Sequence, residues 1–228
     1  MSQLFPSSPQ ASLLPCLFDL SEIEHKALFA DLIYPWELVA RIEFYLLQLL
    51  SGPFKPGIHS PVPASATIGP NVYLGPDCSV EPGVYIKGPA WIGRGCTLRQ
   101  GLYCKENVIA EAGSFLGHAS ELKNCYLMPK AEVPHFNYVG DSILGTRAHL
   151  GAGVILSNVR LDKRTIAIRL GDERIDTGLE KLGAIIGDGC EIGCNSVLNP
   201  GSILGRKSAL YPLSYWNGIL EENGRVAR

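Results

Sequence analysis

Three histidines, His118, His135 and His149, lie close together in the middle of the chain. Histidine titrates near neutral pH, so it can act as a general base, and it is also the commonest metal ligand in proteins. His135 has the most specific surroundings, because Pro134 stiffens the backbone before it and Asn137 begins a group of polar residues after it. His135 is therefore the least easily explained as a lone surface histidine.

An aliphatic or small apolar residue returns every six positions through much of the chain. The run is Val62, Ile68, Leu74, Val80, Ile86, Ile92, Leu98, Cys104, Ala110, Leu116 and Leu122. Glycine often follows the aliphatic residue, which frees the backbone near a corner. This hexapeptide repeat predicts an all-β solenoid, a parallel β-helix of triangular section with ~18 residues per coil and coils ~4.8 Å apart.

The segment before the repeat, residues 1–57, is expected to be a tail and a helical cap. The first 15 or so residues are rich in Ser and Pro and are expected to be loose. Ser21-Glu22-Ile23-Glu24 resembles a capping box and predicts a helix to about Ile33, which Pro35 ends. A second helix, about residues 36–50, carries an apolar stripe that we expect to cover the open end of the solenoid.

The solenoid itself is assigned to residues 58–210. Its ladder slips by one residue near Leu127 and again near Leu144. The repeat is interrupted from about residue 157 to 183, where a β-rich run and a Gly171-Asp172-Glu173 turn predict a projecting β-hairpin. Residues 211–228 are aromatic and then charged, and we expect them to form a C-terminal cap.

The composition narrows the classes of partner. The net charge is −2 and the chain has no long run of Lys or Arg, so we expect neither nucleic acid nor a membrane as a partner. The apolar stretch at residues 44–50 is too short to span a bilayer. Of the seven cysteines, Cys78, Cys96 and Cys190 occupy the small position of a hexad. They suit core filling in a reducing cytoplasm, where we expect the protein to act.

The residues around His135 resemble one family. The stretch Val133-Pro134-His135-Phe136-Asn137-Tyr138-Val139-Gly140-Asp141-Ser142, followed by Leu150-Gly151-Ala152-Gly153, is similar to the acetyltransferase domain of bifunctional N-acetylglucosamine-1-phosphate uridyltransferase/glucosamine-1-phosphate N-acetyltransferases. Related sugar-1-phosphate nucleotidylyltransferases share Asn158-Val159-Arg160-Leu161-Asp162-Lys163. The resemblance covers roughly residues 58–210 and implies a left-handed β-helix. The family's phosphate loop of the nucleotidyltransferase half does not occur here, so uridylyl transfer is not expected and a separate nucleotidyltransferase would be a partner.

The resemblance also implies roles for individual residues. His135 corresponds to the catalytic base. Substrate contacts are implied at Lys123, Asn137, Tyr138, His149, Asn158 and Arg99. Contacts with acetyl-CoA, the co-substrate, are implied at Ala152, Lys163, Arg164, Cys194 and Tyr211.

Four of these positions depart from the family pattern. The gap from Arg99 to Lys123 is one hexad longer here, which puts Arg99 on another side of the triangle. His149 replaces an Asn of the family, and Cys194 and Tyr211 stand where the family has small residues.

The repeat itself predicts a further contact. Val133 stacks over Leu116, so His135 is predicted one coil above His118, with the imidazoles ~5 Å apart.

The implied function is an acetyl-CoA-dependent N-acetyltransferase acting on an amino-sugar 1-phosphate. The expected acceptor is glucosamine 1-phosphate, in UDP-N-acetylglucosamine biosynthesis, and the expected assembly is a homotrimer with the site between neighbours. Galactosamine 1-phosphate or a nucleotide-linked amino sugar is an alternative acceptor. A non-catalytic trimer that binds a sugar phosphate or nucleotide sugar is an alternative from another class. A carbonic anhydrase that uses the three histidines is a fourth reading, but His149 should point elsewhere and no metal is expected.

Overall fold

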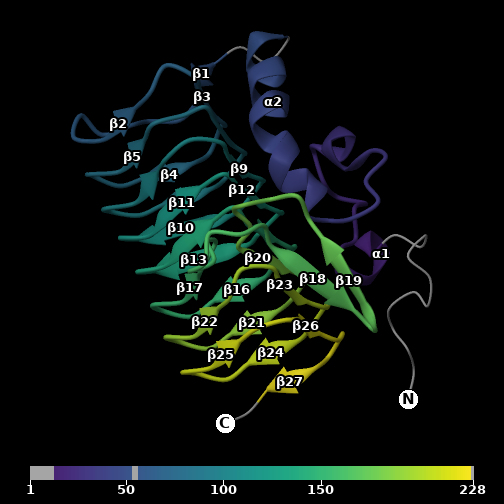
Figure 1. Cartoon of the computed structure of the whole chain (residues 1–228). Helices are drawn as coiled ribbons and strands as arrows, with labels where there is room; N and C mark the ends of the chain where they lie inside the picture. The colour runs from purple at the N-terminus through teal and green to yellow at the C-terminus, as the bar shows by residue number, and fades with distance from the viewer. Residues whose placement is uncertain (1–12, 53–55, 227–228) are drawn as a thin grey trace.

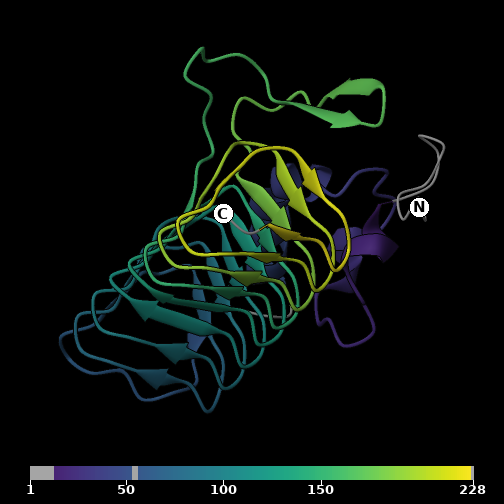
Figure 2. The same ribbon diagram turned by 90° about the horizontal axis from the view of Figure 1, so that it is seen from below.

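The computed structural model describes residues 13–52 and 56–226. The expectation of a loose tail falls mostly on residues 1–12, which lie outside the described residues. The described chain is a left-handed parallel β-helix with an N-terminal helical segment and an inserted hairpin, as the sequence predicted (Figure 1). Figure 2 looks along the stack of coils and shows their triangular outline.

Three parallel sheets form the sides of this prism. Within the described residues, sheet A contains β1 Gly57–Ile58, β3 Val72–Leu74, β6 Ala90–Ile92, β9 Val108–Ala110, β12 Cys125–Leu127, β15 Ile143–Leu144, β20 Ala184–Ile186, β23 Ser202–Leu204 and β26 Ile219–Leu220. Sheet B contains β2 Thr67–Ile68, β5 Tyr85–Ile86, β8 Tyr103–Cys104, β11 Glu121–Lys123, β14 Tyr138–Gly140, β17 Ile155–Leu156, β22 Val197–Leu198 and β25 Tyr215–Trp216. Sheet C contains β4 Ser79–Val80, β7 Thr97–Leu98, β10 Phe115–His118, β13 Glu132–His135, β16 His149–Leu150, β21 Glu191–Ile192, β24 Ala209–Leu210 and β27 Arg225–Val226.

The interior of the prism is the predicted aliphatic ladder. Ile68 pairs with Ile86 across two coils, 18 positions later, and both belong to the cluster that fills the core. In the middle coils the partners are only 17 positions apart, as with Leu116 and Val133. The predicted one-residue slips are therefore confirmed. The shorter coils matter for the site, because residues 17 positions apart stack on one another there.

The outer face of sheet A is covered, and this corrects one expectation. The helix α2, Glu37–Ser51, lies along the side of the coils and contacts β12, instead of closing the open end (Figure 1). Its buried Ile42 and Leu46 share a cluster with the outward-facing Ile109 and Tyr126 of sheet A. The outward positions of this sheet are apolar, so burying them beneath the helix removes from water a surface that would otherwise be exposed.

The segment before α2 also differs from the expectation. A short helix, α1, spans Leu14–Leu17, and the predicted capping box does not open an α-helix but precedes a 3₁₀ turn, η1, at Lys26–Phe29. The reason is a longer-range partner: the buried Glu111 carboxylate of sheet A accepts the backbone N–H groups of Glu24 and His25, at 3.0 and 3.1 Å. The same carboxylate accepts a hydrogen bond from the Tyr126 hydroxyl. Glu111 thus fastens the N-terminal segment to the solenoid.

The hairpin consists of β18, Ala167–Leu170, and β19, Glu173–Asp176, as predicted. Its buried Ile166 and Ile168 join the same outer cluster, and Gly201 of the solenoid lies beneath them, where an added Cβ would stand 2.8 Å from Ile166. The hairpin therefore covers the C-terminal part of sheet A, as α2 covers the N-terminal part.

The end of the chain is a further coil. We expected residues 211–228 to form a separate cap, but β25, β26 and β27 pair in register with the preceding coil of each sheet. The coil continues because Trp216, Leu220 and Val226 supply inward apolar side chains.

The seven cysteines are all free thiols, five of them buried. No helix in the described ranges is long and apolar enough to cross a membrane.

Candidate functional site

Two corners of the prism border sheet B, and several of the predicted site residues lie at them. The corner between sheets C and B carries His118, His135 and Ala152 in successive coils, 17 positions apart. We call it the histidine corner. The corner between sheets B and A carries Asn124, Asp141 and Asn158, again 17 positions apart, and we call it the amide corner.

His135 is the last residue of β13, where sheet C meets the histidine corner. His118 and His135 are register partners, so the predicted stacking of these two residues is confirmed. Both side chains are exposed. The His118 ring is held by two contacts. Its Nδ1 lies 2.7 Å from the Gln100 carbonyl oxygen of the preceding coil, and the ring packs edge-on against the Phe136 ring, with the centroids 5.2 Å apart. The predicted ~5 Å separation between the imidazoles remains a prediction.

Asn137 holds the turn that follows His135. The residue is buried, its Oδ1 accepts the backbone N–H of His135 at 2.9 Å, and its Nδ2 donates to the Gly151 carbonyl at 2.8 Å. Asn137 is thus enclosed within the turn, and a contact between its side chain and substrate stays a prediction. Its contribution is to fix the backbone that presents His135.

At the amide corner the tightened turns bring three polar side chains together. Asn124 and Asp141 both have positive φ, which Asn and Asp tolerate better than most residues. The two Asp141 oxygens accept hydrogen bonds from the Nδ2 groups of Asn124 and Asn158, respectively. The Asp141 carboxylate is thereby held between coils beside sheet B.

Tyr138 lies on sheet B beside this corner. It is half-buried, and burial raises the pKa of its hydroxyl, while a hydrogen bond with Asn158 acts in the opposite direction. Gly140 is required beneath them: an added Cβ would stand 2.6 Å from the Tyr138 hydroxyl and 2.8 Å from Nδ2 of Asn158. The structure therefore brings two of the predicted substrate-contacting residues, Tyr138 and Asn158, into contact.

Lys123 supplies the cation at the same corner. Its Nζ lies 3.8 Å from the Glu106 carboxylate, which also accepts a 3.0 Å hydrogen bond from Lys87. That bond, with the positive charges of Lys87 and Lys123, lowers the pKa of Glu106. Lys123 is the last residue of β11 in sheet B, whereas Arg99 follows β7 of sheet C, so the predicted separation of these two residues is confirmed.

The positions expected to meet acetyl-CoA fall into two places. Ala152 and Cys194 continue the histidine corner, since the Asn195 amide bonds the Ala152 carbonyl, and Tyr211 follows β24 at the next coil. The Ala152 amide makes no hydrogen bond within the described part of the chain, whereas the amide of Gly153 is occupied by the His135 carbonyl. Lys163 belongs to the loop before the hairpin.

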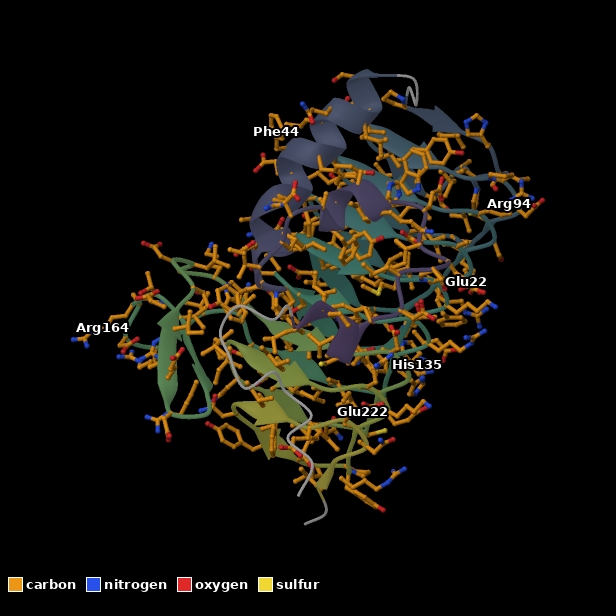
Figure 3. The ribbon with its side chains drawn as sticks, turned by 90° about the vertical axis from the view of Figure 1, so that its right-hand side faces the viewer. Glu22, Phe44, Arg94, His135, Arg164 and Glu222 are labelled. Atoms are coloured by element: carbon orange, nitrogen blue, oxygen red, sulfur yellow. The ribbon has the colours of Figure 1, made fainter. Side chains whose placement is uncertain are left out.

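Three further predicted positions belong to neither set of stacked residues. Arg99 pairs with Glu81 at 2.8 Å. His149 stands on the outer face of sheet C, where Nδ1 is 2.8 Å from the Glu132 carboxylate. Arg164 lies on the opposite side of the molecule from His135 (Figure 3). Within one chain, therefore, the loop that carries Lys163 and Arg164 does not reach His135.

Glu132 and Glu111 were missed by the sequence analysis. Glu132 is 17 positions before His149 and becomes its register partner. The signal was available, because a coil shortened by one residue aligns residues at that spacing. Glu111 has no such signal, since its partners, Glu24 and His25, come from a segment outside the repeat.

Comparison with known proteins gives a consistent relationship. No protein-family model matches the chain. A bifunctional sugar-1-phosphate nucleotidylyltransferase/acetyltransferase of Sulfurisphaera tokodaii is 29% identical over 190 residues, which are 83% of this chain and 46% of that protein. A bifunctional protein GlmU of Methanococcus maripaludis is 27% identical over 191 residues, 84% of this chain and 45% of that protein. The chain is similar to the C-terminal half of these enzymes. It spans about half their length.

Two further matches are to proteins named as an acetyltransferase and an acyltransferase. An uncharacterized acetyltransferase, YaiX, of Escherichia coli is 31% identical over 141 residues, 62% of this chain and 61% of that protein. A solved structure of a UDP-N-acetylglucosamine acyltransferase from Arabidopsis has 14% identity and a TM-score of 0.30, and covers 73% of this chain and 62% of that chain. At that TM-score the structural likeness supports no argument about function.

The two corners together provide the groups for proton transfer and anion binding. An exposed imidazole stands at one edge of sheet B, and an ammonium, a phenol and an amide stand at the other. Within the described ranges no three His, Cys, Asp or Glu side chains converge as metal ligands. His149 belongs to sheet C, where its register partner is Glu132, and so it does not stack with His118 and His135.

Proposed function

We propose that this protein is an acetyl-CoA-dependent N-acetyltransferase whose acceptor is an amino-sugar 1-phosphate, namely glucosamine 1-phosphate, in UDP-N-acetylglucosamine biosynthesis. The observation that carries the proposal is the pair of corners bordering sheet B, with His135 on one and Lys123, Tyr138 and Asn158 on the other. Homology to bifunctional enzymes that contain an acetyltransferase supports it.

In the proposed reaction His135 removes a proton from the sugar ammonium group, because only the free amine has a lone pair. The amine nitrogen then bonds to the thioester carbonyl carbon. The carbon–sulfur bond breaks, the proton held by His135 passes to the departing thiolate, and the second proton of the former ammonium nitrogen is lost to water, which leaves the neutral amide. The unoccupied Ala152 amide is positioned to stabilise the negative charge that develops on the carbonyl oxygen.

The sugar would lie on sheet B with its phosphate toward Lys123. Tyr138 and Asn158, which bond each other, would contact its hydroxyl groups. Coenzyme A would follow the histidine corner past Ala152 and Cys194. Because Arg164 lies away from His135 in one chain, its contact with the ligand would come from a neighbouring copy, which fits a homotrimer with shared sites.

The test is mass-spectrometric detection of N-acetylglucosamine 1-phosphate after incubation with acetyl-CoA and glucosamine 1-phosphate, with the oligomeric state measured by light scattering. His135→Ala should lower the rate by about 10²- to 10⁴-fold. His118→Ala is the matched control, and it should retain most of the activity. Equal activity of wild type and His135→Ala would contradict the assignment of the base.

A non-catalytic trimer is the second candidate. The side chain of Tyr211 is half-exposed where the family has a small residue, which would narrow the path of coenzyme A. This candidate would be favoured over the enzyme if the protein binds glucosamine 1-phosphate but forms no product, and if Tyr211→Ala forms no product either.

A further inference from the structure

Two cysteines stack on one another just before the first two strands of sheet C. β4 is the end strand of this sheet, and β7 is its neighbour (Figure 1). Ser79 of β4 is the register partner of Thr97 of β7. Cys78 and Cys96 come one residue earlier, so they occupy the same inward position of successive coils. We call these two residues the thiol pair.

The spacing of the thiol pair suits a covalent bond. Residues stacked on adjacent parallel strands are about 4.8 Å apart, and disulfides form where the Cα atoms are about 4.4–6.8 Å apart. The Cys78 sulfur points toward the coil of Cys96, since it lies 3.2 Å from the Gly93 carbonyl oxygen. The Cys96 sulfur lies 3.2 Å from the Glu111 carbonyl oxygen and is also within hydrogen-bonding reach of Cys78. A bond between the two sulfurs therefore requires side-chain rotation and no change of register.

Cys78 is the more acidic member of the pair. The hydrogen bond from the Cys96 thiol, with those from the Cys96 amide, the Ser60 hydroxyl and the Gly95 amide, lowers the pKa of the Cys78 thiol, although burial acts in the opposite direction. The same contact with Cys78, together with burial, raises the pKa of the Cys96 thiol. The thiolate is the nucleophilic form of cysteine. Cys78 is therefore the residue that reacts first with an oxidant, and Cys96 is the thiol that follows.

The thiol pair lies near the end of the solenoid that α2 does not close. Ser60, in the first described coil, precedes Cys78 in the stack, and its hydroxyl accepts the Cys78 amide at 2.8 Å. Cys78 retains 7% of its surface exposed, whereas Cys96 is fully buried. A small oxidant that enters from the end coil therefore meets Cys78 before Cys96.

Cys190 shows what a cysteine that only fills the core looks like. It occupies the same hexad position, but its neighbours in the stack are Ala148 and Ser208, because the strands that follow them are in register. Its sulfur lies 3.3 Å from the Ser208 hydroxyl. Burial raises the pKa of the Cys190 thiol to about 11. The thiol pair differs from Cys190 in having a second thiol within reach and a more acidic first one.

We propose that the thiol pair is an oxidative modification site, at which a peroxide converts Cys78 and Cys96 into a disulfide that fastens the end coil to the next one. The site is independent of the proposed acetyl transfer and of His135.

The reaction has two steps. The Cys78 thiolate bonds to one oxygen of hydrogen peroxide, the oxygen–oxygen bond breaks, and the departing hydroxide takes up the proton that Cys78 had released and leaves as water. Cys78 is then a sulfenic acid. The Cys96 sulfur bonds to the Cys78 sulfur, the sulfur–oxygen bond breaks, and the departing hydroxide leaves as a second water with the Cys96 proton. Two electrons pass from the two sulfurs to one peroxide, and a thiol reductant reverses the change.

The experiment is peptide mapping of the full chain after treatment of the folded protein with hydrogen peroxide. The remaining thiols are blocked with iodoacetamide, and the protein is then unfolded, digested with trypsin and examined by mass spectrometry. Trypsin cuts after Lys87 and after Arg94, so a disulfide would hold the peptide with Cys78 to the peptide with Cys96 until a reductant is added. This linked species should form, and Cys78 should be oxidised at least tenfold faster than Cys190.

Three variants separate this reaction from general oxidation of thiols. Cys96→Ser should abolish the linked species and leave a sulfenic acid at Cys78, which dimedone labels. Cys78→Ser should abolish the linked species and leave Cys96 reduced. Cys190→Ser is the matched control, at the same hexad position, and should leave the yield of the linked species unchanged.

The exposed Cys194 reports whether the peroxide has acted. The proposal would be overturned if Cys194 is oxidised while no linked species forms, if the linked species forms only after unfolding, or if Cys78 and Cys190 are oxidised at equal rates. None of these readings depends on acetyl transfer.

Discussion

Sheets A and B stack the same kind of inward aliphatic residues, but the outer face of sheet A is buried and that of sheet B is accessible to solvent. The outward residues of sheet A include Trp91, Ile109 and Tyr126, and all three are buried beneath other parts of the chain. At the matching positions of sheet B, Glu121 and Ile155 remain partly accessible, Ile155 with 36% of its surface exposed. One face of the prism is thus a second core, and the other is open to ligands.

The difference shows how one repeat can serve two purposes. The inward residues fix the coil, so the outward residues are free to vary between faces. Apolar side chains on sheet A are covered by α2 and by the hairpin. Polar side chains at the edges of sheet B are left uncovered, where tight turns present them. Function is therefore expected where the coils are open, and stability where they are covered.

The largest expected effect separates the two faces directly. Ile109→Ala should lower the free energy of unfolding by about 2–5 kcal/mol, because it leaves a cavity between sheet A and the covering segments. Ile155→Ala removes the same atoms from an exposed position of sheet B and should cost less than about 1 kcal/mol. Urea unfolding followed by circular dichroism measures both. Equal losses would show that the outer face of sheet A is not a second core.

A smaller effect is expected at the tie between the N-terminal segment and the solenoid. Glu111→Gln replaces a carboxylate that accepts two backbone N–H groups by an amide that can satisfy fewer donors, and it should cost about 1.5–3 kcal/mol. The matched control is Glu121→Gln on sheet B, whose contact with Lys105 is 3.9 Å and partly exposed. That change should be near zero in the same unfolding measurement. A Glu111→Gln protein as stable as the control would contradict the anchoring role.

The third expectation concerns pH and the covered face. Burial lowers the pKa of His25 to about 4 from an ordinary value near 6.5. Between these values the unfolded chain binds a proton that the folded chain does not, so stability is lost as pH falls below 6.5. The loss from this group between pH 7 and pH 5 should be about 2 kcal/mol.

The measurement compares the urea unfolding of wild type and His25→Gln at both pH values. The variant should be less stable at pH 7 but should lose about 2 kcal/mol less on going to pH 5, because the titrating group is gone. Burial and the Glu111 charge raise the pKa of Glu24, an effect of opposite sign that both proteins share. Equal losses in the two proteins would show that His25 titrates normally in the folded state.

Much of the site follows from counting residues along the ladder. The stacking of His118 with His135 was predictable, because the aliphatic residues Leu116 and Val133 fix the register of both. Burial of Asn137 was not predictable in the same way. Its side chain turns inward to satisfy backbone groups of two coils, and this depends on the path of the turn rather than on the repeat.

The sequence by itself determined the β-helix, the two one-residue slips and the inserted hairpin, because a period of six with inward aliphatic residues has few other ways to bury its apolar surface. Tertiary structure alone decided that α2 lies along sheet A and that residues 211–226 form a further coil. It also decided that Glu132 orients His149 in a hollow lined by Lys130 and Arg147. The physical reason is range. The repeat specifies contacts one coil away, whereas the position of the covering segments depends on which outer face offers enough apolar surface to bury.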